Sequence, residues 1–349
     1  MIYFDVTKAA QAGHHSGLTR VSARLREELG DAIVPVKWSG WRKRFVAADG
    51  RRLNFQPTDW FFTVELFSSA ERRGFADFVN APPCRLAAMF HDAIPLRFPE
   101  ITWPHSVRRH PDYMALLARF DRVLAISGAS RRELEQFWTE HQLNVRARVS
   151  TVLLGADFDR SPRVVESSGV TPKRASLLCV GIIEPRKNQA FLLEVCAELW
   201  RAGVDFELHV VGRVNPHFGE PIVERLRELA RSESRLCYHG AADDRRLRDL
   251  YRSATAVVFP TIAEGCGLPL LEAMWRGTPC VCSDLPVLLE NATGGGCVVA
   301  RVNDRADWVE KLRRVLSDAN AGRRLREEVA ARALPTWADT ARAVWRELA

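Results

Sequence analysis

Residues 264–272 combine two glycines, a proline and two carboxylates at a spacing that suits the binding of a phosphate ester. They read Glu-Gly-Cys-Gly-Leu-Pro-Leu-Leu-Glu and follow an apolar run that ends at Phe259. Gly265 and Gly267 allow the backbone to turn tightly and to approach a ligand closely. Pro269 suits the first position of a helix, where its missing N–H costs nothing. Because the N–H groups at a helix start attract anions, this stretch predicts a phosphate site.

Two carboxylates, Glu264 and Glu272, flank this loop with seven residues between them. We expect Glu272 in the first helical turn, where a carboxylate is stabilised and can accept hydrogen bonds from ribose hydroxyls. Glu264 precedes the loop and should face whatever group the phosphate carries. The alternative is an ordinary capped helix in a sheet protein, with both glutamates solvated.

The elements that must position this loop alternate between apolar strand-like runs and helix-like segments. Strands that are apolar on both faces and joined by helices predict a doubly wound parallel sheet. The alternation is clear in the second half of the chain and less clean in the first half. The expected strands are 2–5, 61–64, 86–91, 122–127, 177–181, 206–212, 235–240, 256–260 and 280–282.

The length of 349 residues predicts two domains, each able to bury its own core. We expect a first Rossmann-like α/β domain over 1–160 and a second over 176–334, with a Ser-, Pro- and Val-rich linker over 161–175 between them. A final helix over 335–349 should pack back on the first domain. Because ligands bind beyond the carboxyl ends of the strands in such sheets, the two domains should face a cleft.

Composition excludes several other classes of protein. A hydrophobic content of 47% is too high for a disordered chain, and 21 Gly and 18 Pro are too few for a collagen-like one. No apolar run approaches the roughly 18–20 residues that span a bilayer, and Met1 to Val6 does not have the order of a signal peptide. We therefore expect a cytoplasmic protein. The formal charge of +7 permits nucleic acid, an acidic membrane or phosphorylated small molecules as partners.

The eight cysteines form no CxxC pair and no zinc-finger spacing, and several lie in apolar runs. We expect buried, reduced thiols, without a disulfide or a metal site. Asp157 and Asp159 formally make an Asp-x-Asp pair, a pattern that can hold a divalent cation on a diphosphate. Their position at the entry to the linker favours a structural role instead.

The loop closely resembles the donor-site motif of the family 4 retaining glycosyltransferases, which have the GT-B fold. The resemblance covers nearly the whole chain, is most specific in the carboxyl half, and is weaker over 30–85. It is nearest to bacterial polysaccharide mannosyl- and rhamnosyltransferases. Cys266 stands where most members carry an aromatic residue, and the arginine that many members place before the phosphate-binding lysine is absent. The other matching segments are 5–7, 16–20, 90–95, 98–100, 181–188 and 284–297.

The resemblance implies a set of donor-binding residues. It places the phosphate-binding lysine on Lys187, which follows a parallel strand and can offer a point charge to a diphosphate; a solvated surface lysine is the alternative. Arg186 is a second candidate for the phosphates, or else a surface residue at a helix start. Gly17 would let the backbone approach the donor phosphate from the other domain, and its alternative is a plain turn before a helix from Thr19. Gly212 would form the backbone wall beside the nucleotide, or a simple turn.

His91 is the candidate catalytic residue of the first domain. It ends an expected strand and should therefore face the cleft, and the resemblance implies that it helps to position the donor sugar. A buried histidine hydrogen-bonded to a backbone carbonyl is the alternative. Asp92 would orient His91 or cap the following turn. His14 and His15 are expected to be loop residues.

These residues predict a metal-independent retaining hexosyltransferase with no cofactor. Lys187 and the amides of Cys266, Gly267 and Leu268 would stabilise the leaving diphosphate, while Glu264 holds sugar hydroxyls and Glu272 the ribose. The donor would be a GDP-, dTDP- or UDP-linked sugar bound by the second domain. The acceptor, on the side of the first domain, would be a glycan or lipid-linked glycan of a bacterial surface polysaccharide.

Other functions stay open at this point. A sugar-nucleotide epimerase of the same fold would use the cleft without an acceptor, and a phosphorylase would need a pyridoxal-bearing lysine and a larger chain. A nucleic-acid-binding protein would explain the basic charge but not the glycine loop, so no nucleic acid is expected. A basic and aromatic cluster could dock on an anionic membrane, or be a solvated loop with partly buried tryptophans. Its members are Trp38, Trp41, Arg42, Lys43, Arg44 and Phe45.

Overall fold

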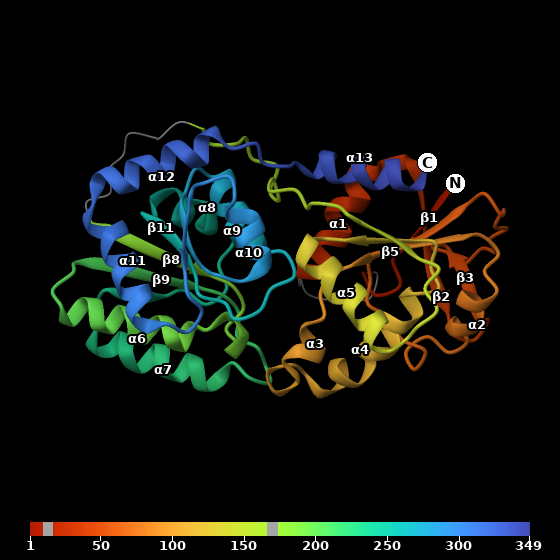
Figure 1. Cartoon of the computed structure of the whole chain (residues 1–349), viewed down its shortest axis with the longest axis horizontal. Coiled ribbons are helices and arrows are strands. Elements are labelled where there is room, and N and C mark those ends of the chain that lie inside the picture. The colour runs from red at the N-terminus through yellow and green to blue at the C-terminus, as the bar shows by residue number, and fades with distance from the viewer. Residues whose placement is uncertain (10–16, 166–173) are drawn as a thin grey trace. The chain divides into compact units, whose positions relative to one another are not determined.

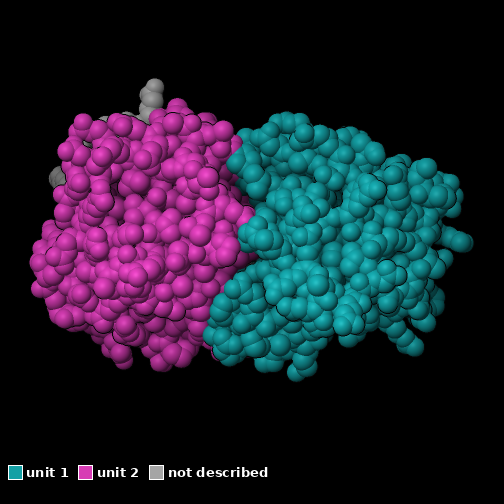
Figure 2. Space-filling view, viewed as in Figure 1, with its two compact units in different colours: residues 1–155, 335–349 teal, residues 156–334 magenta. Residues whose placement is uncertain are grey.

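The computed structural model describes residues 1–9, 17–165 and 174–349 and divides into two compact units (Figure 2). The first unit comprises residues 1–155 and 335–349, and the second comprises 156–334. His14, His15 and most of the expected linker lie outside the described residues. The described linker residues Ser161 and Val164 belong to the second unit. The Trp275 indole N–H donates to the Ser161 carbonyl at 2.9 Å, and the Val164 amide donates to the Trp275 carbonyl at 3.0 Å.

The first unit has a seven-stranded sheet in the order β3-β2-β1-β4-β5-β6-β7, in which only β2 and β3 pair antiparallel. Its central strands β1 and β4 are buried at every position, as expected for parallel strands covered on both faces. The strands are β1 (Ile2–Asp5), β2 (Ile33–Ser39), β3 (Arg44–Ala47), β4 (Trp60–Thr63), β5 (Arg85–Phe90), β6 (Arg122–Ala125) and β7 (Arg148–Thr151).

Helices cover both faces of this first sheet (Figure 1). Helix α13, at the end of the chain, packs against α1, and the Thr340 hydroxyl donates to the Leu153 carbonyl at 2.8 Å. Gly155 leaves no room for a side chain there, because a Cβ would lie 2.2 Å from the Trp337 amide nitrogen. The helices are α1 (Gly17–Leu29), α2 (Phe75–Asn80), α3 (Ile94–Arg97), α4 (Pro104–Leu117), α5 (Gly128–Glu140) and α13 (Trp337–Leu348), with short 3-10 turns η2 (Gly30–Ala32) and η3 (Pro99–Ile101).

The basic and aromatic cluster over 38–45 is part of the β2–β3 hairpin rather than of a loop, and its tryptophans differ in burial. Trp38 and Phe45 face each other in the pairing register and pack into an aromatic core, with their rings 5.0 Å apart. Trp41, at the turn, is 89% exposed. The alternation of side chains in the two strands places Trp38 and Phe45 inward and leaves Arg44 exposed.

The second unit has a six-stranded, fully parallel sheet in the order β10-β9-β8-β11-β12-β13. The chain runs outward from β8 in one direction and outward from β11 in the other, so the order reverses between these two strands. Such a reversal opens a crevice beyond the carboxyl ends of the two strands. The strands are β8 (Ala175–Val180), β9 (Phe206–Val211), β10 (Leu236–Tyr238), β11 (Ala256–Phe259), β12 (Cys280–Ser283) and β13 (Cys297–Ala300).

Helices α6, α7 and α11 pack on one face of this second sheet, and α8, α9 and α12 lie on the other (Figure 1). The prediction of two doubly wound α/β domains is therefore confirmed. Within the described residues, no helix is long and apolar enough to cross a membrane. The helices are α6 (Gln189–Arg201), α7 (Glu220–Ser232), α8 (Asp244–Ser253), α9 (Leu268–Trp275), α10 (Pro286–Ala292), α11 (Arg305–Ser317) and α12 (Ala319–Ala331), with a 3-10 turn η4 (Pro185–Lys187).

Candidate active site

The two loops that follow β8 and β11 meet at the switch point of the second sheet. The amide of Ile262 donates to the Arg186 carbonyl at 2.9 Å, and the Thr261 hydroxyl donates to the same carbonyl at 3.0 Å. These bonds fix η4, which carries Arg186 and Lys187, against the start of the glycine loop. Residues separated by about 75 positions in the sequence are thereby brought to one place.

Lys187 and Glu264 form a buried ion pair at this junction, with the Lys187 Nζ 2.5 Å from the Glu264 Oε1. The same oxygen accepts a hydrogen bond from the Arg186 Nη1 at 3.0 Å and from the Thr261 hydroxyl at 2.8 Å. The Lys187 ammonium also lies 4.9 Å from the centre of the Phe259 ring. Lys187 is therefore not the solvated surface lysine that the alternative described.

Charge and burial oppose each other in this cluster. Burial is the largest influence on Lys187 and lowers its pKa, while the negative charge of Glu264 acts in the opposite direction. Burial acts to raise the pKa of Glu264, but the positive charges of Lys187 and Arg186 outweigh it and the net pKa is lowered. Glu264 is thus a carboxylate held between two cations.

Arg186 is tied to the protein on several sides. Its Nη2 lies 2.7 Å from the Glu184 carboxylate, and its Nη1 also donates to the Ala263 carbonyl at 2.9 Å. Glu184 in turn accepts from the Asn215 side chain at 2.8 Å. Glu184 was not predicted from the sequence as a site residue, although it stands only two residues before Arg186. In this arrangement Arg186 holds the loop and shares Glu264 with Lys187.

Two glycines permit close approach of the backbone around the site. A Cβ on Gly212 would lie 1.7 Å from the Gly181 carbonyl oxygen, so the ends of β9 and β8 can touch only without a side chain there. Gly267 has φ +80°, and a Cβ on it would lie 2.5 Å from a Leu288 methyl group. That Gly212 lies beside the nucleotide remains a prediction. Position 212 requires glycine, because any side chain there would overlap the Gly181 carbonyl.

Helix α9 begins directly after Gly267, so Pro269 and Glu272 take other helix positions than those expected. Pro269 is the second residue of the helix rather than the first, and Leu268 is the first. Glu272 therefore lies beyond the first turn, where it is 2% exposed and the Tyr251 hydroxyl donates to its Oε2 at 3.4 Å. The prediction that Glu272 lies in the first turn was therefore wrong by less than one turn. Gly267 adopts the left-handed conformation and directly precedes the helix, so the helix starts one residue earlier than predicted.

Cys266 lies at the amino-terminal end of α9 and is held by a residue that the sequence analysis missed. The Asn291 side chain on α10 donates to the Cys266 carbonyl at 2.6 Å. Burial, assisted by the negative charge of Glu264, raises the pKa of Cys266 to about 12, so its side chain is a neutral thiol. The first backbone amides of a helix have no acceptor within the helix. The amides of Cys266, Gly267 and Leu268 lie at the amino-terminal end of α9.

The first unit carries the other two predicted residues. Gly17 is the first residue of α1, and a Cβ there would meet nothing within 4 Å. His91 follows β5 directly and is buried, with its Nε2 2.8 Å from the Val64 carbonyl, as the structural alternative described. Burial lowers the pKa of His91, which favours the neutral ring with its Nε2 proton donated to Val64. Asp92 caps the next turn by accepting from the Ile94 amide at 3.0 Å.

A buried network in the first unit was not anticipated from the sequence. Arg72 lies between Asp5 and Glu65, with nitrogen–oxygen distances of 2.7 Å to each, and all three side chains are buried. Glu65 also accepts from the amides of Lys8 and Ala9 at 2.7 and 2.9 Å. The burial of Glu65 and the charge of Asp5 raise its pKa to about 7. The network therefore ties the end of β1 to the loop after β4.

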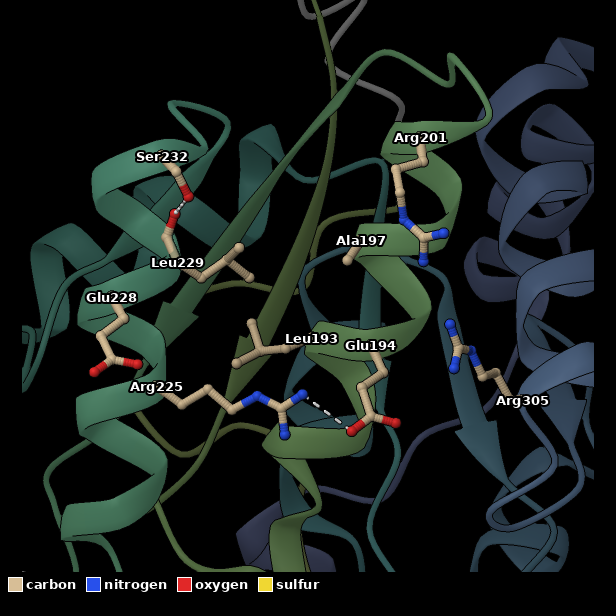
Figure 3. A pocket seen from close by; sticks show the side chains of 9 residues that line it. All are labelled: Leu193, Glu194, Ala197, Arg201, Arg225, Glu228, Leu229, Ser232 and Arg305. Atoms are coloured by element: carbon tan, nitrogen blue, oxygen red, sulfur yellow. Dashed lines mark hydrogen bonds and ion pairs between the residues drawn. The ribbon is translucent and has the colours of Figure 1, made fainter.

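Asp159 of the formal Asp-x-Asp pair takes part in structural contacts. Its carboxylate lies 3.0 Å from the Arg276 Nη2 and accepts from the Ser161 hydroxyl at 2.6 Å. Among the described residues, no group of three or more His, Cys, Asp or Glu is placed to hold a metal ion. A surface groove of about 480 Å³ lies between α6 and α7, where Arg225 and Glu194 form an ion pair at 3.0 Å (Figure 3), and none of the predicted site residues lines it.

Fold and site together define a class of protein. A doubly wound parallel sheet with a lysine, a carboxylate and a helix amino terminus at its switch point is typical of proteins that bind nucleotides or phosphorylated ligands. Residues 162–332, nearly all of the second unit, match the family described as "Glycosyl transferases group 1".

Relatives of known function include several sugar transferases. The chain is 32% identical over 217 residues to the serotype-specific mannosyltransferase WbdA of Escherichia coli, a match that covers 58% of this chain and 26% of WbdA. It is 26% identical over 278 residues to the lipopolysaccharide core biosynthesis mannosyltransferase LpsB of Rhizobium meliloti, covering 75% of this chain and 74% of LpsB. The chain thus spans about a quarter of the length of the WbdA proteins that it matches.

Solved structures show the same fold over the whole chain. Sucrose-phosphate synthase from Thermosynechococcus elongatus superposes with a TM-score of 0.72 at 16% identity, covering 99% of this chain and 98% of that one. HepE of Anabaena, solved in complex with UDP and glucose, gives a TM-score of 0.72 at 14% identity with the same coverage. The predicted GT-B fold is confirmed.

Proposed function

We propose that this protein is a retaining hexosyltransferase that moves a mannose- or rhamnose-type sugar from a nucleoside diphosphate to a glycan or lipid-linked glycan. The observation that carries the proposal is the Lys187–Glu264 pair at the amino end of α9, on the switch point of a parallel sheet. The similarity to WbdA and LpsB, both named as mannosyltransferases, supports the choice of sugar and a role in bacterial surface polysaccharide synthesis.

Lys187 and the amides of Cys266, Gly267 and Leu268 would receive the donor diphosphate. An ammonium group has three donors, so Lys187 can keep its bond to Glu264 and still offer N–H groups to a phosphate oxygen. Negative charge grows on the leaving diphosphate as the sugar–oxygen bond breaks. A buried cation and oriented amides stabilise that charge without reorganising at the moment of reaction.

The two glutamates would hold the remaining parts of the donor. Glu264 is kept ionised by its two cations and can accept hydrogen bonds from sugar hydroxyls. Glu272 would accept from the ribose. The leaving phosphate can take the acceptor's proton, which would allow the acceptor to attack from the same face of the sugar. Attack from that face would retain the anomeric configuration. The Nε2–H of His91 donates to the Val64 carbonyl, so the other atoms of its ring would position the donor sugar.

In this proposal the protein needs no metal ion, because cationic side chains and a helix terminus act on the diphosphate in its place. The contacts of Asp159 with Arg276 and Ser161 support a structural role for the Asp-x-Asp segment.

Calorimetric titration with GDP, UDP and dTDP, each with and without EDTA, tests the proposal. We expect one nucleotide to bind selectively and to bind equally well in EDTA. The preferred nucleotide then selects the sugar donors to assay against polysaccharide acceptors, with the anomeric configuration of the product read by NMR. If no nucleotide binds, or if the product is inverted, the proposal is wrong.

A further inference from the structure

The turn that joins β2 to β3 carries a tryptophan that is almost fully exposed. At 89%, Trp41 has the highest exposure among the large hydrophobic side chains of the described residues. The Arg42 guanidinium carbon lies 5.9 Å from the centre of the Trp41 ring. A tryptophan has a large apolar body and one polar N–H, so it is suited to a boundary between water and an apolar phase.

Positive charge surrounds this tryptophan. Residues 37–52 contain six basic residues and a single acidic one, Asp49, which pairs with Arg51 at 2.6 Å. Arg42 also donates to the Gly50 carbonyl at 3.3 Å, which leaves its charge in place. Within the described residues, the other five cations of this segment form no ion pair, so the protein does not neutralise them. They are Lys37, Arg42, Lys43, Arg44 and Arg52.

The turn is held in place by the rest of the first unit. Lys43 has φ +50°, and its aliphatic stem lies over Gly74, where a Cβ would be 2.9 Å from the Lys43 Cδ. Trp38 and Phe45, which flank the turn in the pairing register, are buried in the aromatic core. Because the turn is already ordered, binding through it costs little conformational entropy.

The turn also lies at the same edge of the first sheet as His91. Strand β2 runs parallel to β1, β1 to β4, and β4 to β5, so all four strands end at one edge. The turn at 40–43 follows β2, and His91 follows β5. Neighbouring strands lie about 4.8 Å apart, which separates these two strand ends by roughly 14 Å.

We propose that the β2–β3 turn docks on the surface of an anionic phospholipid bilayer. Trp41 enters the headgroup region, and Arg42, Lys43 and Arg44 lie against the lipid phosphates. Each cation close to such a surface strengthens binding by about fivefold. A bilayer suits the turn better than single-stranded nucleic acid, which is bound by several aromatic side chains along a basic groove. Docking there would bring the chain to a lipid-linked acceptor, a consequence that rests on the proposed function.

Sedimentation of the full chain with phospholipid vesicles tests the docking without nucleotide or acceptor, so its outcome does not depend on glycosyl transfer. We expect binding to phosphatidylglycerol vesicles, little binding to phosphatidylcholine vesicles, and release at high salt. The double variant Arg42→Gln and Arg44→Gln should bind at least about tenfold more weakly. The matched variant Arg323→Gln and Arg324→Gln, at exposed positions of α12, should bind like the natural chain.

Three results of this experiment would overturn the proposal. The first is no binding to phosphatidylglycerol vesicles. The second is an equal loss of binding in the two double variants, which would reduce the effect to net charge. The third is tight binding to a single-stranded oligonucleotide together with weak binding to the vesicles, which would assign the basic turn to nucleic acid.

Fluorescence quenching by lipids with brominated acyl chains tests the role of Trp41. We expect the vesicle-bound natural chain to be quenched and Trp41→Phe, which keeps an aromatic ring, to bind the vesicles without this quenching. Trp345→Phe is the matched control, because Trp345 is 46% exposed on α13, which carries two basic and two acidic residues. This control should still be quenched. Quenching that persists in Trp41→Phe would place another tryptophan at the membrane and contradict the proposal.

Discussion

Both units bury an ionic cluster at the carboxyl ends of their strands, and the two clusters are opposite in charge arrangement. In the second unit one carboxylate, Glu264, lies between two cations, and its pKa is lowered. In the first unit one cation, Arg72, lies between two carboxylates, and the pKa of Glu65 is raised to about 7. Arg186 also pairs with Glu184, so the second unit's cluster balances two cations with two carboxylates and keeps Glu264 ionised, whereas the first unit's cluster favours a proton on Glu65.

The largest expected effect is a loss of stability on substitution of Arg72, which pairs with both carboxylates of the first unit's cluster. Arg72→Met would leave Asp5 and Glu65 buried without their cation. Removal of one partner from a buried ion pair typically costs about 3–5 kcal/mol in the free energy of unfolding. Urea unfolding followed by circular dichroism measures this loss, and Arg73→Met, at the exposed neighbouring residue, serves as the control. A loss no larger than that of the control would show that Arg72 does not hold the two carboxylates.

Lys187→Ala should lower turnover more than it lowers stability, because Arg186 and the Thr261 hydroxyl still hold the Glu264 carboxylate. Loss of one charge-stabilising contact typically lowers the catalytic rate by on the order of 100- to 1000-fold. The rate is measured with the nucleotide sugar that calorimetry selects, and Arg201→Ala, an exposed cation of the same unit, is the matched control. A Lys187→Ala protein with near-normal turnover would break the analogy between this cluster and an anion site.

The pH dependence of stability separates the two clusters further. Glu65 titrates near its ordinary value of 4.5 when unfolded and at about 7 when folded, so the folded chain binds more protons between these values. By linkage, its contribution to the free energy of unfolding is complete below pH 4.5 and falls as the pH rises toward 7. Unfolding in urea at pH 5 and pH 7.5 should show this fall, and Glu65→Gln should flatten it. An equally steep fall in the variant would assign the effect to other groups.

The smallest expected effect concerns Asn291, which supports the second cluster through the glycine loop. Asn291→Leu removes the hydrogen bond to the Cys266 carbonyl, worth about 1 kcal/mol. We expect the KM for the donor to rise by roughly fivefold while kcat changes less, because the loop is loosened but Lys187 stays in place. Steady-state kinetics measure both constants, with the exposed Asn320→Leu as control. A fall in kcat alone would contradict a positioning role.

Much of the fold could be predicted, because central parallel strands are apolar on both faces and leave a plain pattern. The strands that escaped prediction lie at sheet edges or between charged residues. The edge strand β7, for example, has no fully buried residue, so its sequence Arg-Val-Ser-Thr carries no apolar run. Strand β13 follows three glycines and is half-buried at three of its four positions.

The site was predictable only where its chemistry is local in the sequence. The glycine loop and Lys187 each carry a recognisable short pattern, but their ion pair spans 77 positions. Asp5, Glu65 and Arg72 come from a strand end and two loops, and nothing in their neighbours indicates a buried network. Asn291 lies 25 residues from the carbonyl that it binds, in a helix whose position only the packing determines.

The return of α13 to the first unit also bears on how the chain is made. Residues 156–334 are contiguous, so the second unit has all its parts as soon as they leave the ribosome. The first unit still lacks the helix that covers α1 until residues 335–349 have been synthesised. Domains that emerge from the ribosome generally fold as units. Of the two units, the one whose synthesis begins first is therefore the one that is completed last.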